Sequence, residues 1–195
     1  MNQQQFTNYK LFMLLLGSKA PGRHVEQHDF YFGIATTLKE LIPKIKAFWP
    51  EAVKNLHIDA YREVTSVNGH AISIAEKTAN QPEQENKLFF INLGGYQANQ
   101  MAETHYTVLS VQADHAAAVQ EAKRTVFFKT NTITTTKGAN AHVDDKYGID
   151  VDDIYQIEDI LTPNQKDKFI INITPNANLP EDEIHLGYFK LDKIV

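Results

Sequence analysis

The chain repeats one of its own segments, and this repetition limits the folds open to it more than any other feature. Residues 10–17 read KLFMLLLG, and residues 87–94 read KLFFINLG, 77 positions later. At this offset seven positions between residues 10 and 34 are identical, whereas composition alone predicts about one or two identities. An internal duplication of this length predicts two related modules with the same order of secondary structure.

The first copy, residues 9–76, predicts the order strand–strand–helix–strand–strand. Strands are expected over residues 10–16, 26–35, 56–64 and 70–75. The first of these has apolar side chains on both faces, which is typical of a strand covered on both sides. The helix is expected to begin at Thr37 with a capping box completed by Glu40, while Pro43 should kink it or delay its regular start. Asn68-Gly69 predicts a hairpin turn before the last strand.

The second copy is predicted to occupy residues 87–195, after a polar linker over residues 77–86. Its expected elements are strands 87–93 and 103–111, a helix from Asp114 to about Phe127, an inserted surface loop 130–141, an acidic irregular stretch, and strands 169–173 and 184–191. Residues 1–8, rich in Gln and Asn, are expected to form a disordered tail. The predicted fold class is therefore α+β, with two tandem strand–strand–helix–strand–strand modules related by pseudo-two-fold symmetry.

Composition narrows the classes of function. The net charge of −5 and the pI near 5.9 argue against binding nucleic acid or an anionic membrane, because such proteins need a basic surface. The chain has no cysteine, so disulfides and cysteine-ligated metals are excluded, and His and carboxylates remain as metal ligands. The apolar run 11–16 is too short for a signal peptide or a membrane span. These features predict a soluble cytoplasmic protein, and an exposed sheet edge would allow a homodimer.

Five segments of the first copy form a distinctive set of motifs. They are Lys10–Gly17, Pro21–His24, Glu26–Asp29, Lys46–Pro50 and Leu56–Ala60. In the second copy, Phe90–Tyr96 and His142–Gly148 fit the same pattern. Together they resemble a bacterial family known as domain of unknown function 1543, in two tandem copies over nearly the whole chain. The resemblance implies a two-copy module without an assigned activity, and it supplies no catalytic residues.

Four polar positions are shared by the two copies and make the first candidate site. Glu26, His28, His57 and Asp59 correspond to Glu103, His105, His142 and Asp144, the last two at an offset of 85 because of the inserted loop. Each Glu/His or His/Asp pair is two residues apart, so both side chains point to the same side of a strand. Neighbouring strands would then gather ligands for zinc, iron, nickel or manganese, or an acid–base pair. The alternative is structural, with a carboxylate satisfying a buried imidazole.

Two other groups of charged residues are candidates of a different kind. Lys19, Arg23 and His24 lie in a Gly- and Pro-containing loop and, with Arg62 on a later strand, could bind an anion. The alternative is a solvated basic loop. A run of acids invites a calcium interpretation, but it lacks the ligand spacing of an EF-hand and is typical of a solvated face. The run comprises Asp144, Asp145, Asp150, Asp152, Asp153, Glu158 and Asp159.

Two functions from different classes therefore stay open. The first is a non-catalytic ligand-binding or protein-interaction module built by internal duplication. The second is a small metal-dependent or acid–base enzyme with its site at the His/carboxylate cluster, and a divalent metal is the only cofactor indicated. Close approach of the four side chains in an open site would favour the second hypothesis, whereas burial of His28 against Phe30 with a backbone hydrogen bond would favour a structural role.

Overall fold

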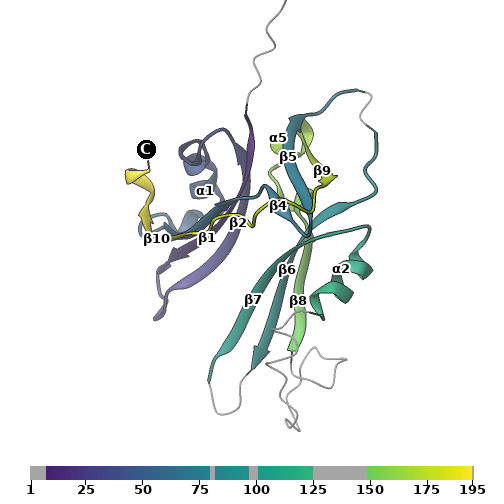
Figure 1. The fold of residues 1–195 in the computed structure, drawn as a ribbon. Helices are drawn as coiled ribbons and strands as arrows, with labels where there is room; N and C mark the ends of the chain where they lie inside the picture. The colour runs from purple at the N-terminus through teal and green to yellow at the C-terminus, as the bar shows by residue number, and fades with distance from the viewer. Residues whose placement is uncertain (1–7, 80–81, 97–100, 125–148, 195) are drawn as a thin grey trace, which may run out of the picture. The chain divides into compact units, whose positions relative to one another are not determined.

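The structure, a computed structural model, describes residues 8–79, 82–96, 101–124 and 149–194. The chain forms two compact units. Unit 1 comprises Met1–Gln81 together with Leu161–Val195, and unit 2 comprises Pro82–Ile160 (Figure 1). Antiparallel strands with short helices make up both units, which is the α+β class expected from the sequence.

Unit 1 is built on a four-stranded antiparallel sheet in the order β10-β3-β1-β2. Its strands are β1 (Lys10–Ser18), β2 (Gln27–Ala35), β3 (His57–Glu63) and β10 (His185–Lys190). Nearly every residue of β1 is buried, because one face meets the helical segment that follows β2 and β5 contacts the strand as well. The prediction of a strand covered on both sides is confirmed.

The connection between β2 and β3 is helical, but its start differs from the prediction. A 3₁₀ turn, η1 (Leu38–Leu41), leads into α1 (Ile42–Phe48), and η2 (Pro50–Ala52) follows. Pro43 lies in the first turn of α1, where its missing N–H costs nothing, so it delays the regular helix. Thr37 makes no side-chain cap. The carboxylate of Glu40 instead accepts hydrogen bonds from the backbone N–H and hydroxyl of Thr36.

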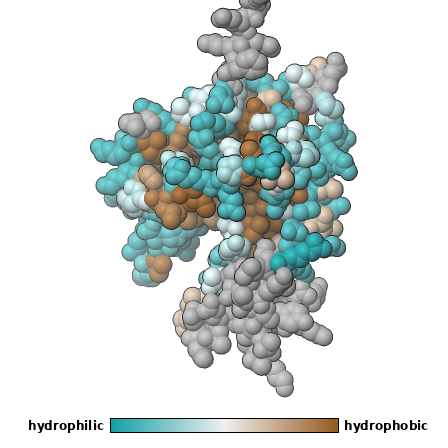
Figure 2. All heavy atoms as spheres, viewed as in Figure 1, coloured by the Kyte–Doolittle hydropathy of each residue, from teal (hydrophilic) through white to brown (hydrophobic). Residues whose placement is uncertain are grey.

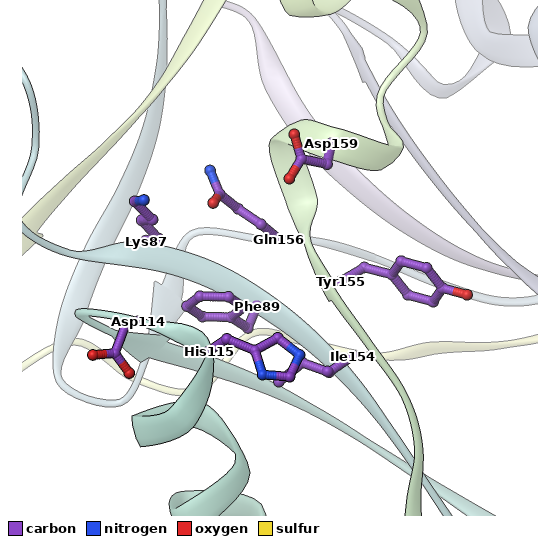
Figure 3. A pocket seen from close by; sticks show the side chains of 8 residues that line it. All are labelled: Lys87, Phe89, Asp114, His115, Ile154, Tyr155, Gln156 and Asp159. Carbon is purple, nitrogen blue, oxygen red and sulfur yellow. The ribbon is translucent and has the colours of Figure 1, made fainter.

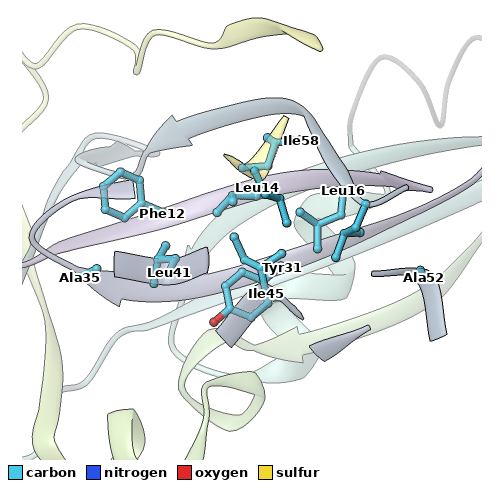
Figure 4. Close-up of a cluster of buried hydrophobic side chains, with 11 residues drawn as sticks. Phe12, Leu14, Leu16, Tyr31, Ala35, Leu41, Ile45, Ala52 and Ile58 are labelled. Atoms are coloured by element: carbon cyan, nitrogen blue, oxygen red, sulfur yellow. The ribbon is translucent and has the colours of Figure 1, made fainter. Parts of the chain in front are cut away.

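A hydrophobic core fills the space between this sheet and the helical connection. Figure 4 shows side chains from β1, β2 and β3 meeting Leu41 and Ile45. The cluster comprises Phe12, Leu14, Leu16, Tyr31, Ala35, Leu41, Ile45, Ala52, Leu56, Ile58 and Leu191. Leu14 and Ile58 are both 0% exposed, so the centre of the sheet is a fixed platform. Side chains that point away from it take their positions from this packing.

A second sheet of unit 1 joins distant parts of the chain. Its order is β4-β5-β9, with strands β4 (Ser66–Val67), β5 (His70–Glu76) and β9 (Phe169–Pro175). Asn68 and Gly69 join β4 to β5 with φ of 49° and 72°, as the type I′ hairpin requires. The helix α5 (Pro163–Lys168) precedes β9, and the turn η3 (Leu191–Lys193) follows β10.

The sequence analysis assigned the C-terminal strands to the second module, but in the structure they belong to unit 1. β9 pairs with β5, and β10 pairs with β3, so residues 161–195 belong to unit 1. The reason is that β5 and β3 each have an edge that no strand nearby in sequence covers, and the returning segment supplies the missing partner. β10 leaves Leu186 and Tyr188 exposed, and Figure 2 shows brown, apolar residues among teal ones in this part of unit 1.

Unit 2 contains a three-stranded antiparallel sheet in the order β7-β6-β8. Its elements are β6 (Lys87–Tyr96), β7 (Glu103–Gln112), α2 (His115–Ala122), β8 (Ile149–Gln156) and α4 (Ile157–Ile160). Asp114 caps α2 as predicted, accepting a hydrogen bond of 2.8 Å from the Ala117 N–H. Small residues of α2, Ala118 and Ala122, pack on the buried Ile91 of β6.

Strand β8 was not predicted, because its acidic residues made the segment look irregular. The predicted inserted loop, residues 130–141, lies outside the described residues, as does most of the predicted tail. No helix in the described part of the chain is long and apolar enough to cross a membrane.

Candidate metal centre

Strand register brings the two histidines of the first copy to the same place. Gly17 of β1 pairs with His28 of β2 on one side and with His57 of β3 on the other. Paired residues of neighbouring strands point to the same face of a sheet. A register shift between Leu15 and Leu16 leaves Asp59 as an extra residue of β3. This irregularity is a β-bulge, which re-aims side chains next to it.

Gly17 provides the space in which these side chains meet. A Cβ atom placed on Gly17 would lie 2.4 Å from Asp59 Oδ2, 2.6 Å from His57 Nε2 and 2.7 Å from Glu26 Oε1. Three polar atoms from two neighbouring strand regions therefore converge on the point where any other residue would carry a side chain. Gly17 is itself buried, so the space is enclosed by the sheet on one side.

The distances within the cluster are short. His57 Nε2 lies 2.9 Å from Glu26 Oε1 and 3.1 Å from Asp59 Oδ1. His28 Nε2 lies 3.2 Å from Asp59 Oδ2 and 3.8 Å from Glu26 Oε1. Glu26, His57 and Asp59 each offer one ligand atom within 4.8 Å of the others. The four side chains that the sequence selected are thus brought together, and His28 is at the edge of the group.

The orientation of the His57 ring is set by its other nitrogen. Nδ1 lies 2.8 Å from the carbonyl oxygen of Asn55, and a carbonyl can only accept, so Nδ1 carries a proton. In the neutral ring Nε2 is then an unprotonated lone pair. The side chain is only 4% exposed, and Nε2 has no hydrogen bond with acceptable geometry among the described residues. A buried acceptor thus faces two carboxylates.

These spacings agree with those around one ion. A metal bound at about 2.0–2.1 Å holds neighbouring ligand atoms about 2.9 Å apart in octahedral geometry and about 3.3 Å apart in tetrahedral geometry. The distances of 2.9 Å and 3.1 Å from His57 fall in this interval. Metal-bound histidines also commonly donate their second N–H to a backbone carbonyl, as His57 does. The donor set of imidazole nitrogen and carboxylate oxygen suits transition metals.

The cluster is enclosed on one side and open on the other. His57 is buried, whereas the side chains of Glu26 and His28 are 42% and 48% exposed. The ring of Tyr188 on β10 packs against His57 with 4.0 Å between ring centroids and an angle of 34° between the ring planes. His28 is not packed away against Phe30 with a backbone hydrogen bond, which was the geometry expected of a purely structural role. Solvent or a small molecule can therefore reach Glu26 and His28, whereas Asp59 Oδ2 is buried.

Unit 2 matches this arrangement only in part. Gly94 pairs with His105 as Gly17 pairs with His28, and His105 lies 3.8 Å from Glu103. On the other side Gly94 pairs with Asp150, so by strand register Asp150 takes the place that His57 has in unit 1. This differs from the predicted equivalence of His57 with His142, since the sequence alignment matched a segment that precedes the strand. His142 and Asp144 lie outside the described residues.

The predicted anion-binding loop does not form one site with Arg62. Lys19, Arg23 and His24 are exposed in the loop that follows β1. Arg62 pairs with Met13, toward the opposite end of β1 from Gly17. Its guanidinium donates to Met13 Sδ. Burial lowers the pKa of Arg62, and the nearby carboxylates of Asp182 and Glu181 act in the opposite direction. Strand length separates Arg62 from the loop, so the four residues do not act together.

The acidic run is divided between a strand and a short helix. Within its described part, Asp153 and Asp159 are exposed, as expected of a solvated face, and Asp144 and Asp145 lie outside the described residues.

Unit 2 also has a pocket of about 330 Å³ (Figure 3). Asp114, one of its lining residues, already accepts a hydrogen bond from the Ala117 N–H as the cap of α2. The pocket is lined by Lys87, Phe89, Asp114, His115, Ile154, Tyr155, Gln156 and Asp159.

Three contributors to the cluster were not predicted. The role of Gly17 could have been inferred, because a glycine that ends an apolar strand in both copies suggests a close approach. The Asn55 carbonyl and the Tyr188 ring left no sequence signal. Tyr188 reaches the site through a pairing between residues more than 120 positions apart, which local patterns cannot indicate.

The fold and the cluster together define an α+β protein with a His/carboxylate cluster at one end of the antiparallel sheet β10-β3-β1-β2. Residues 23–74 match the family model described as Domain of Unknown Function (DUF1543), the family that the motifs of this segment resemble. All four cluster residues lie within the matched segment. The crystal structure of a protein Il1583 from Idiomarina loihiensis is similar, with a TM-score of 0.64 and 20% identity over 95% of this chain and 99% of that chain. At this identity the likeness shows the fold. No curated protein matches the sequence.

Proposed function

We propose that unit 1 binds a divalent metal ion through Glu26, His57 and Asp59, with His28 beside it as a further ligand or as a partner of Asp59. The observation that carries the proposal is the buried Nε2 of His57. It is aimed at two carboxylates at 2.9 Å and 3.1 Å and makes no hydrogen bond among the described residues. A cation at this point would satisfy all three groups at once.

Charge supports the same conclusion. The site brings two carboxylates against an imidazole lone pair, and leaving a buried polar group without a partner costs about 1–3 kcal/mol. A divalent ion would neutralise both carboxylates and accept the lone pair. The alternative is a proton on His57, which would make the cluster a structural ion pair. These two interpretations differ in a measurable way, because only the first needs a metal.

Metal-dependent chemistry is a second candidate function, and solvent access to the cluster favours it. Structural zinc sites are usually closed by four protein ligands, whereas catalytic sites keep a position for water or substrate. The exposure of Glu26 and His28 supports an open position of this kind. A bound ion there would supply Lewis-acid chemistry or lower the pKa of a bound water, and the exposed imidazole of His28 would be available as a proton acceptor.

We further propose that the two sheets arose by duplication and that unit 1 kept the metal site. The support is the shared register, since in both sheets the glycine at the end of the first strand pairs with a histidine. In both, a shift in the same place leaves one aspartate extra, Asp59 in β3 and Asp152 in β8. Among the described residues of unit 2, strand register puts Asp150 rather than a histidine at the position of His57.

The test is metal content and metal affinity of the purified chain. Elemental analysis after mild purification should find a divalent metal near one equivalent, and isothermal titration of the metal-free protein with Zn²⁺ or Mn²⁺ should give one site. Asp59→Asn keeps the shape but removes a charge, and should weaken binding by at least about tenfold. If neither experiment finds metal near one equivalent, the structural ion pair remains as the explanation of the cluster.

The chain offers a matched control for His57. His70 also has Nδ1 against the carbonyl oxygen two residues earlier, at 2.9 Å from Asn68, but the described residues place no carboxylate in an ion pair with it. His57→Ala should abolish metal binding, and His70→Ala should leave it unchanged. Equal losses in the two variants would point to general destabilisation, and circular dichroism of both proteins would reveal it.

A further inference from the structure

A pocket of about 320 Å³ lies beside His57 in unit 1. It forms where the end of α1, the segment before β3 and the end of β10 come together, and both His57 and Tyr188 line it. Its volume lies at the lower end of the range for small-molecule sites, roughly 300–1,000 Å³. None of the sequence motifs pointed to this pocket, because its walls come from three separate parts of the chain.

The charge of the pocket is opposite to that of the chain. Lys46, Lys54 and Lys190 line it, and Asp192 is its one lining carboxylate. The described structure gives none of these three lysines an ion pair or hydrogen-bond partner, whereas Asp192 lies 3.9 Å from Lys193. All three lysines are exposed, so water solvates them when the pocket is empty. An anion bound among them would be attracted by three positive charges at once.

His57 connects the pocket to the cluster. The pocket is also lined by Asn55, whose carbonyl oxygen holds Nδ1 of His57 at 2.8 Å. The Tyr188 ring packs against the imidazole and lines the pocket as well. A ligand in the pocket therefore contacts the group that orients the metal ligand, and its binding would be coupled to metal binding in both directions.

We infer that this pocket binds the anionic group of a small molecule, a phosphate or a carboxylate, that the protein takes up beside its metal centre. The inference rests on the proposed metal-binding function. Lysine is a compact point charge that binds phosphate and carboxylate oxygens without demanding one planar geometry. The lysines determine that the ligand is an anion, and the neighbouring metal centre would determine which chemistry that ligand meets.

The experiment titrates inorganic phosphate into the metal-free protein while ¹⁵N NMR shifts are followed, with acetate titrated in a parallel series. Backbone signals of residues 53–57 and of β10 are expected to move, and the signals of unit 2 to stay in place. Lys54→Ala and Lys190→Ala should each weaken binding by roughly three- to tenfold, and the double variant by more. Lys39→Ala, an exposed lysine of η1 outside the pocket, is the control. Comparison of phosphate with acetate identifies which anion the pocket prefers.

Zinc titration of the same preparations separates this inference from the function on which it depends. Lysine variants that bind zinc normally but bind the anion weakly would support it. If the unaltered chain binds zinc but binds no anion, the inferred anion site is wrong and the metal site is unaffected. The same holds if it binds an anion whose affinity neither lysine substitution changes. Absence of zinc binding in the unaltered chain would overturn the proposed function, and the inference with it.

Discussion

Substitution of Gly17 by alanine tests the geometry of the cluster with a single methyl group. The added Cβ would lie 2.4 Å from Asp59 Oδ2, 2.6 Å from His57 Nε2 and 2.7 Å from Glu26 Oε1, and Cβ contacts under 3.0 Å are essentially never seen. To reach that limit the three atoms must retreat by at least about 0.6, 0.4 and 0.3 Å. Metal–ligand distances tolerate only about ±0.2 Å, so all three ligands would leave bonding range together.

The expected result is a large loss of metal affinity with little change in the stability of the metal-free protein. Displacing ligands from a site typically costs 10- to 100-fold in metal affinity, and we expect at least about 100-fold here because three ligands move. Gly17 does not have a positive φ. Alanine therefore suits the strand backbone and even reduces the entropy lost on folding.

Zinc affinity by competition titration and thermal unfolding of the metal-free protein are the measurements. Gly22→Ala is the matched control, since it adds the same methyl group in the following loop, where no atom lies within 4 Å. Its φ of 78° makes the variant less stable by about 1 kcal/mol, but zinc affinity should not change. Zinc affinity of Gly17→Ala equal to that of the unaltered chain would refute the placement of the ion over Gly17.

Three further predictions concern the platform beneath the site. Tyr31→Phe should raise the free energy of unfolding by about 1 kcal/mol, because the buried Tyr31 hydroxyl has no hydrogen-bond partner in the described structure. Burial raises the pKa of Tyr31 to about 12 from 10, so the folded state disfavours the phenolate and ionisation of Tyr31 lowers the free energy of unfolding as the pH rises from 10 through 12; alkaline denaturation should be weaker in the variant. Ser18→Ala should cost about 1 kcal/mol in urea denaturation, since the hydroxyl donates to the Ala52 carbonyl at 2.9 Å in a buried position; an unchanged midpoint would contradict this. Ile58→Ala should cost about 2–5 kcal/mol because Ile58 is 0% exposed, and a loss below 1 kcal/mol would show that the core is not packed as described.

Local patterns predicted most elements of residues 9–76 and the start of the helix in unit 2. Apolar residues on both faces of β1, the hairpin signal at Asn68-Gly69 and the cap at Asp114 each depend on neighbours in the sequence, and the structure confirms all three. Pro43 was expected either to kink the helix or to delay its regular start, and its place in the first turn of α1 shows that it delays the start. The His and carboxylate spacing was also local, since residues two apart on a strand share a face.

The parts that could not be predicted depend on pairing between distant segments. Sequence order gave no reason for β9 and β10 to return to unit 1, because open strand edges are visible only once a sheet exists. The register of β8 was equally hidden. His142-Val143-Asp144 resembles the start of β3, but strand pairing depends on the sum of many contacts, and it placed Asp150 opposite Gly94. Short identities between the two segments therefore did not predict which residue of β8 lies opposite Gly94.

The return of the C-terminal segment also has a consequence for the order in which unit 1 is completed. Glu26, His28, His57 and Asp59 all leave the ribosome long before residues 161–195, which supply β9, β10 and the Tyr188 ring. During synthesis β3 thus has a free edge, and His57 has no aromatic cover, for the time needed to make about 120 further residues. The four cluster side chains can come together early, but the pocket that shares His57 with them cannot exist until β10 has paired with β3. Any selectivity that this pocket confers consequently depends on that late pairing.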